Sequence, residues 1–220
     1  MEKIISGVRK FQSAVFGSYQ SLFEELATGQ HPRALFITCS DSRIDPNLVT
    51  QTIPGELFVL RNAGNIVPPY GAANGGEGAT IEYALTALNI RSIIVCGHSH
   101  CGAMGGLLQL DKLGNMPLVS SWLRHAEATR RVVLEKHAGA TGEDLVLEAA
   151  KENVLMQLEN LQTHPAVAAG LATGKLKLYA WVYEIENGQV LAYDPVSNQF
   201  LPVNKQGQSI PDEQSQAGSL

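Results

Sequence analysis

The chain has few charged residues, few aromatic residues and only three cysteines among its 220 residues. Charged side chains make up 17% of the sequence and the net charge is −5, which argues against a nucleic-acid-binding protein. Three cysteines do not form a disulfide framework, so we expect free thiols and a reducing compartment. No apolar run approaches the length of a membrane span, and the first residues lack the shape of a signal peptide. These absences lead us to expect a soluble protein of the cytoplasm.

The hydrophobic content of 45% is ample for one buried core. The low charged fraction suggests that part of the surface is covered by another subunit. We therefore expect one domain over residues 1–203. Residues 204–220 are polar and rich in Gln, Ser and Gly, so we expect a disordered tail there.

Hydrophobic periodicity predicts strands that alternate with helices, which is typical of an α/β fold with a parallel central sheet. The last two strands are joined at Asn187-Gly188, a strong hairpin signal, so that pair should be antiparallel. The expected strands are 34–38, 57–60, 92–97, 176–185 and 190–193, and the expected helices are 2–16, 18–28, 79–89, 102–113, 117–137, 143–162 and 164–172, with a short helix beginning at Asp45-Pro46.

Two motifs follow predicted buried strands: Cys-Ser-Asp-Ser-Arg at 39–43 and His-Ser-His-Cys-Gly at 98–102. Parallel strands that lie side by side end at the same edge of a sheet, so Cys39, His98 and Cys101 should meet there. Two thiolates and one imidazole suit zinc and leave a fourth position for water or for Asp41, as in a catalytic site. The alternative is that the cysteines are small core residues, and for Cys96 we favour that interpretation.

Asp41 and Arg43 are two residues apart, so both side chains can lie on the same side of an extended turn. A bidentate pair with Arg43 would keep the Asp41 carboxylate ionised and away from the metal. The alternative is a surface salt bridge worth under about 1 kcal/mol.

The sequence resembles the β-class carbonic anhydrases over residues 1–203. The two motifs match the zinc motifs of that family, and Pro-Gly-Glu-Leu-Phe-Val-Leu-Arg-Asn-Ala-Gly-Asn at 54–65 matches the segment between them. The resemblance implies one Zn²⁺ per chain. It assigns the zinc ligands to Cys39, His98 and Cys101, the catalytic pair to Asp41 and Arg43, and substrate binding to Gln30, Phe58, Ala63, Tyr83 and Gly102.

The resemblance also implies a fold: a four-stranded parallel sheet with an antiparallel fifth strand and helices on both faces. The N-terminal helices would pack on the partner of a homodimer, which is often assembled further. The implied activity is reversible hydration of carbon dioxide to bicarbonate and a proton by attack of zinc-bound hydroxide. His100 and His31 are candidates for passing the proton to buffer. The alternatives are hydrolysis of carbonyl sulfide or carbon disulfide on the same site, or a non-catalytic zinc-stabilised assembly protein.

Two details of the sequence indicate which branch of the family it resembles. Phe36 stands where a bicarbonate-regulated branch has tryptophan, so we expect an open site with water, and not Asp41, on the zinc. The segments at 66–79 and 95–104 are most similar to the carboxysomal enzymes of cyanobacteria, which usually carry a longer C-terminal extension. This resemblance implies a location in the cytoplasm or inside a carboxysome, with scaffold or shell proteins as partners.

Overall fold

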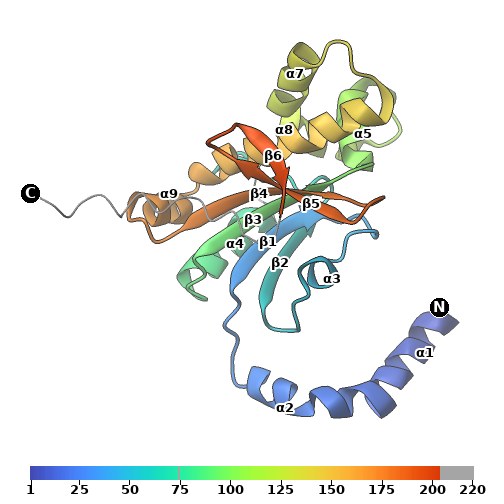
Figure 1. Ribbon diagram of the computed structural model, residues 1–220, viewed down its shortest axis with the longest axis vertical. Helices are drawn as coiled ribbons and strands as arrows, with labels where there is room; N and C mark the ends of the chain where they lie inside the picture. The colour runs from blue at the N-terminus through green and yellow to red at the C-terminus, as the bar shows by residue number, and fades with distance from the viewer. Residues whose placement is uncertain (74, 204–220) are drawn as a thin grey trace, which may run out of the picture.

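A computed structural model describes residues 1–73 and 75–203. It contains a six-stranded sheet with the order β2-β1-β3-β4-β5-β6 (Figure 1). The strands are β1 (Ala34–Cys39), β2 (Leu57–Asn62), β3 (Ser92–His98), β4 (Lys177–Glu184), β5 (Gln189–Asp194) and β6 (Gln199–Pro202). The first four in this order are parallel and β5 is antiparallel to β4, which confirms the predicted fold. The predicted tail over 204–220 lies outside the described residues.

The sequence prediction missed β6, which pairs antiparallel with β5 at the edge of the sheet. Gln199–Pro202 is short and ends in proline, a residue that cannot donate to a strand ladder. Its stability comes from its neighbour, because the Phe200 ring lies 5.4 Å from the Tyr193 ring on β5. No pattern in the local sequence predicts that contact.

The helices differ from their predicted limits mainly where short turns interrupt them. Residues 2–26 form one continuous helical run through a π-helical segment at Phe11–Val15, so the predicted break at Gly17 was wrong. The predicted helix 117–137 is divided by a 3-10 turn at Arg124–Ala126, and helix 102–113 ends at Leu108. The α-helices are α1 (Glu2–Lys10), α2 (Phe16–Leu26), α3 (Pro46–Thr50), α4 (Gly76–Thr86), α5 (Gly102–Leu108), α6 (Pro117–Leu123), α7 (Glu127–Lys136), α8 (Gly142–Gln162) and α9 (Pro165–Ala172).

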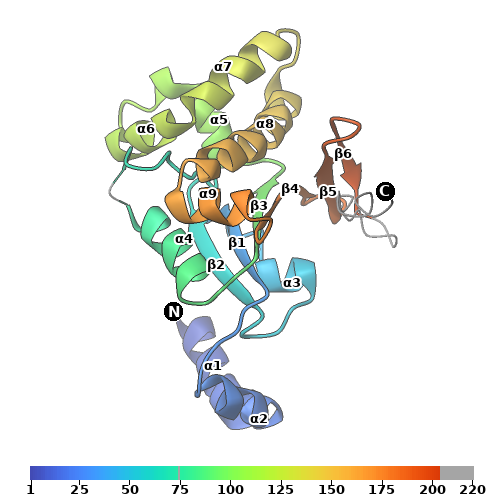
Figure 2. The ribbon, with the colours of Figure 1, turned by 90° about the vertical axis from the view of Figure 1, so that its left-hand side faces the viewer.

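The two faces of the sheet are covered unequally. Helices α4, α8 and α9 pack on one face, where the largest cluster of buried apolar side chains lies. The other face carries a smaller cluster around Phe36, Ile94 and Cys96, beside Ile44 and close to α3 (Figure 2). A third cluster joins Cys39 and Cys101 to α5, α7 and α8. Both metal motifs therefore contact a cluster of buried apolar side chains.

The N-terminal arm, which we define as residues 1–26, extends away from the sheet (Figure 1). It contains no buried residue in α1, in the π-helical segment or in α2. Several of its apolar side chains are exposed, with Ile4 at 64% and Val8 at 52%. The predicted packing of this arm on a partner stays a prediction. No helix in the described part of the chain combines the length and the apolar character that crossing a membrane requires.

Candidate metal centre

The two metal motifs lie at the carboxyl ends of neighbouring parallel strands. β1 ends at Cys39, β3 ends at His98, and the strands are paired in parallel register. Cys39, His98 and Cys101 are all buried, and their ligand atoms lie within 4.8 Å of one another. Within residues 1–73 and 75–203, no other group of three His, Cys, Asp or Glu side chains is placed to hold a metal ion. The structure thus brings the predicted ligand set together.

The protonation of His98 fits a metal ligand. Its Nδ1 lies 2.8 Å from the Ser99 carbonyl oxygen, which can only accept, so Nδ1 carries the proton and donates it. Nε2 is therefore the atom through which the neutral imidazole would bind a metal. This atom is buried and has no hydrogen-bond partner among the described residues. A buried polar atom without a partner is costly, and a metal ion beside the two sulfurs would satisfy it.

The thiols of the chain fall into two classes. The neighbouring Cys101 thiol stabilises the Cys39 thiolate and, against the opposing effect of burial, lowers the pKa of Cys39 to about 4. The same proximity raises the pKa of Cys101, because the two sulfurs share one proton. Burial alone raises the pKa of Cys96 to about 12. Cys96 is thus a core residue, as expected, whereas a cation at the Cys39–Cys101 pair would replace the shared proton.

Asp41 and Arg43 form a bidentate ion pair beside the three ligands. Arg43 Nε and Nη2 donate to the two Asp41 carboxylate oxygens at 2.9 and 2.7 Å, and the Arg43 backbone N–H donates at 3.0 Å. The Arg43 side chain holds the pKa of the Asp41 carboxyl well below its usual range. Asp41 Oδ2 lies 3.9 Å from His98 Nε2. Arg43 is held in turn by the His100 carbonyl oxygen at 2.9 Å.

Two contributors to the site were not predicted. Arg61 donates to the carbonyl oxygens of Cys39 at 3.0 Å, Asp41 at 2.7 Å and Ile44 at 3.0 Å, and so braces the turn that carries the first motif. The Gly64 N–H donates to the Cys39 sulfur at 3.3 Å. Arg61 could have been found from the sequence only with the register of β1 and β2, which pairs it with Thr38.

The predicted substrate-binding residues fall into two groups. Ala63 follows the end of β2 beside Cys39, and Gly102 begins α5 directly after Cys101. Phe58 is paired with Leu35, four residues before Cys39, which corresponds to about 13 Å along the strand. Tyr83 lies with Phe58, at 6.1 Å between ring centroids, and is half exposed.

Gln30 also lies far from the metal ligands of its own chain. It precedes the first residue of β1 and lines a hollow with Leu26 and Pro54, whereas Cys39 ends the same strand. One chain therefore brings Ala63 and Gly102 to the metal ligands but leaves Gln30, Phe58 and Tyr83 at the other end of β1 and β2.

His100 lies at the surface next to the site. Its Nδ1 is 2.7 Å from a Glu143 oxygen and its Nε2 is 3.4 Å from a Glu186 oxygen. Glu186 also accepts from the Ser99 hydroxyl at 2.6 Å, and the Ile185 N–H donates to that hydroxyl at 2.9 Å. The second motif is thereby tied to the end of β4.

The fold and the site define an α/β protein with a buried set of two thiols and one imidazole that could hold a single metal ion. That combination is typical of a zinc enzyme and not of a closed structural site.

Comparisons with known proteins give the particular family. Residues 34–190 match the family model described as carbonic anhydrase. The chain is 60% identical to a carbonic anhydrase of Synechocystis sp. over 91% of its length and 74% of the relative. It is 55% identical to a carbonic anhydrase of Synechococcus elongatus over 99% of its length and 80% of the relative.

Solved structures agree with these relatives. The β-carbonic anhydrase CcaA superimposes with a TM-score of 0.90 at 60% identity, covering 92% of this chain and 98% of that one. A tetrameric β-carbonic anhydrase of Sordaria macrospora gives a TM-score of 0.78 at 29% identity, covering 87% and 95% of the two chains. The chain belongs to the β-class carbonic anhydrases.

Proposed function

We propose that this chain catalyses the reversible hydration of carbon dioxide at a zinc ion held by Cys39, His98 and Cys101. The observation that carries the proposal is the buried Cys-His-Cys set next to the Asp41–Arg43 pair. When bound, zinc acidifies a coordinated water and so supplies a nucleophile near neutral pH. The residues of the chain then orient that nucleophile and hold the substrate.

Asp41 is suited to accept a hydrogen bond from the attacking oxygen. Because Arg43 lowers its pKa, Asp41 remains an acceptor throughout the neutral range. Both Asp41 oxygens are already bound to Arg43, which fixes the plane of the carboxylate. A fixed acceptor turns the proton of the nucleophile toward itself and a lone pair toward carbon dioxide. The same pairing supports an open site in which Asp41 is not a metal ligand.

A second copy of the chain would supply the missing side of the substrate pocket. β2 is the edge strand of the sheet, and it carries Phe58 with Tyr83 beside it. A dimer that joins two β2 edges about a two-fold axis would bring Gln30, Phe58 and Tyr83 of one copy toward Ala63 and Gly102 of the other. The exposed apolar face of the N-terminal arm supports the same assembly, because a second copy would cover it.

The assembly would be a homodimer or a multiple of it. The relative from Sordaria macrospora is tetrameric, which supports assembly beyond a dimer. The likeness to cyanobacterial carbonic anhydrases supports a role in carbon utilization, in the cytoplasm or inside a carboxysome. Fractionation of cells that make the chain, followed by pull-down with purified scaffold and shell proteins, tests the location; recovery only in the soluble fraction, without capture, contradicts encapsulation.

Stopped-flow hydration of carbon dioxide by the zinc-loaded protein tests the function. We expect rapid hydration that is lost when a chelator removes the zinc and restored when zinc is returned. Parallel assays with carbonyl sulfide and carbon disulfide cover the other substrates. Activity on those two alone would replace the proposed substrate, and stoichiometric zinc without any turnover would identify a zinc-stabilised assembly protein.

A further inference from the structure

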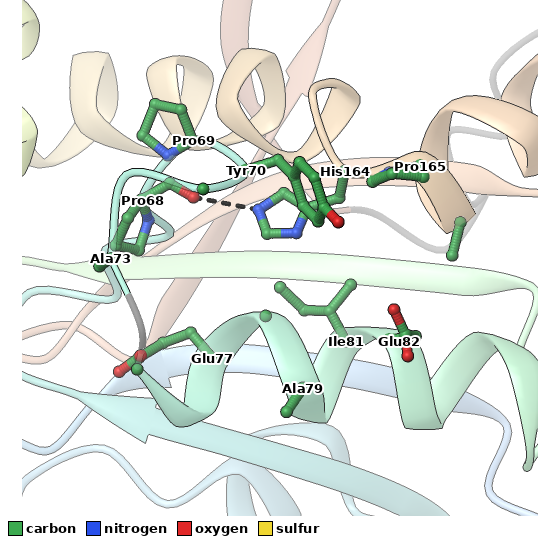
Figure 3. A pocket seen from close by; sticks show the side chains of 14 residues that line it. Pro68, Pro69, Tyr70, Ala73, Glu77, Ala79, Ile81, Glu82, His164 and Pro165 are labelled. Atoms are coloured by element: carbon green, nitrogen blue, oxygen red, sulfur yellow. Dashed lines mark hydrogen bonds between the residues drawn. The ribbon is translucent and has the colours of Figure 1, made fainter.

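Side chains of α8 hold the segment that follows β2. Asn153 Nδ2 donates to the Gly64 carbonyl oxygen at 2.9 Å, and Asn160 Nδ2 donates to the Val67 carbonyl oxygen at 2.9 Å. The Val67 N–H donates to Gln157 Oε1 at 2.9 Å. Beyond this point, His164 Nε2 donates to the Pro68 carbonyl oxygen at 3.0 Å, beside a cavity of about 450 Å³ lined by α4 and the start of α9 (Figure 3). We call residues 63–70 the braced segment.

The amides of α8 also bind one another. Gln157 Nε2 donates to Asn153 Oδ1 at 2.8 Å, and Asn160 Nδ2 donates to Gln157 Oε1 at 3.1 Å. Their spacing of four and three residues places them on one face of the helix. Asn153 and Gln157 are fully buried. Apolar side chains would pack this face at lower cost in desolvation, so the amides indicate a requirement for hydrogen bonds to the backbone of the braced segment.

Gly64 links this network to the metal ligands. Its carbonyl oxygen is held by Asn153, and its N–H donates to the Cys39 sulfur at 3.3 Å. Its φ of +82° favours glycine. A Cβ at this position would lie 3.0 Å from Met104 Cε and 3.1 Å from Ala103 Cβ, so a larger residue would be crowded here. The Gly64 N–H lies in the same peptide plane as the Ala63 carbonyl, which accepts from Trp122 Nε1 at 2.8 Å. Asn153 holds the next peptide plane at the Gly64 carbonyl, so the two anchors together fix the backbone on both sides of Gly64.

We infer that Asn153 is a positioning residue for the metal centre: with Trp122 it fixes the backbone on the two sides of Gly64, whose N–H donates to the Cys39 sulfur. An N–H bound to a thiolate withdraws electron density from the sulfur and weakens its donation to the metal. With zinc bound, this weaker donation from Cys39 would leave more positive charge on the ion and so would favour ionisation of a coordinated water, against the effect of two thiolate ligands. The inference rests on the proposed zinc site but not on the reaction that the site catalyses.

The cobalt-substituted protein tests this inference, because its sulfur-to-cobalt charge-transfer band reports the electron density of the thiolates. In Asn153→Leu we expect the band to move to lower energy, because the sulfur donates more strongly, and the Gly64 amide to exchange faster with deuterium. These readouts do not depend on carbon dioxide hydration, so the inference and the proposed function can fail separately.

Asn160→Leu is the matched control. It makes the same substitution on the same face of α8 but removes a bond to Val67, three residues past Gly64. We expect a comparable loss of stability to urea, with the cobalt band and the exchange of the Gly64 amide unchanged. Asn153→Ser is a second variant, whose hydroxyl is one bond too short to reach the Gly64 carbonyl oxygen but keeps a small polar group in place of an apolar one. A wild-type band in a folded Asn153 variant, or an equal shift in Asn160→Leu, overturns the inference.

Discussion

The metal centre and the N-terminal arm differ in how much of their structure one chain supplies. At the metal centre the three ligands are buried, and the turn after Cys39 is braced by Arg61 and Arg43. The N-terminal arm contains no buried residue and exposes the apolar face of a long helix. The chain therefore brings the predicted metal ligands together by itself. The substrate pocket that we propose would depend on surfaces that a single chain leaves open.

The two regions should therefore respond differently to mutation. Changes at the metal centre should remove zinc or its chemistry without altering assembly. Changes on the N-terminal arm should alter assembly and activity while zinc remains bound.

Loss of a ligand should have the largest effect. In Cys39→Ala and Cys101→Ala we expect zinc content close to zero and a fall in hydration rate of roughly three orders of magnitude or more, because no acidified water remains. Cys96→Ala is the control, since its thiol is equally buried but lies outside the ligand cluster. Metal analysis and stopped-flow assays measure both quantities. Full zinc retention in either ligand variant would contradict the assignment.

Disruption of the Asp41–Arg43 pair should be the next largest effect. In Asp41→Asn and Arg43→Ala we expect the rate to fall about 100-fold or more, because the nucleophile loses its fixed acceptor, while zinc stays bound. Arg33→Ala is the matched control, because Arg33 pairs with Glu56 at 2.9 Å on the exposed surface away from the ligands. If both dyad variants hydrate carbon dioxide as fast as Arg33→Ala, the pair is only a salt bridge.

The N-terminal arm should respond in the opposite way. Val8→Asp with Phe11→Asp places charges on its apolar face. Each side chain loses about 1.5 kcal/mol or more of burial against a second copy, so the dissociation constant of the dimer should rise about 100-fold or more. Light scattering should show smaller particles, with reduced activity and full zinc content.

Ser6→Asp is the control for the arm, since it adds a charge to the opposite face of the same helix. Unchanged particle mass in the double variant would show that the arm does not hold the assembly together. Loss of zinc from a monomeric double variant would show that the metal centre is not self-sufficient after all.

The metal centre could be predicted from the sequence. Cys39, His98 and Cys101 could be predicted because each lies at the end of a buried apolar strand, and parallel neighbours end together. The Asp41–Arg43 pair could be predicted because its partners are two residues apart. Both predictions needed only local patterns and one rule of sheet topology.

Contacts that depend on exact register or on distant packing could not be predicted. Asn153 and Gln157 carry the polar side chains expected on the solvent face of a helix, yet both are buried against the braced segment. β6 has too short a pattern to be recognised without β5. The helical run continues through Gly17, where helix propensity predicted a break. One glycine costs only about 1 kcal/mol in a helix interior, which is too little to end the helix.

The smallest expected effect is that of shortening the chain after Val203. The metal ligands, the Asp41–Arg43 pair, the braced segment and the N-terminal arm all lie within residues 1–203, and the Val203 N–H is the last described donor, bound to the Val190 carbonyl oxygen at 2.9 Å. We therefore expect unchanged zinc content, particle mass and hydration rate. A deeper truncation, after Asp194, is the control. It removes β6 and exposes the edge of β5, so the urea midpoint of unfolding should fall. A change in particle mass or hydration rate after the cut at Val203 would mean that residues 204–220 contribute to the assembly or to the pocket. The N-terminal arm would then share that role with the end of the chain.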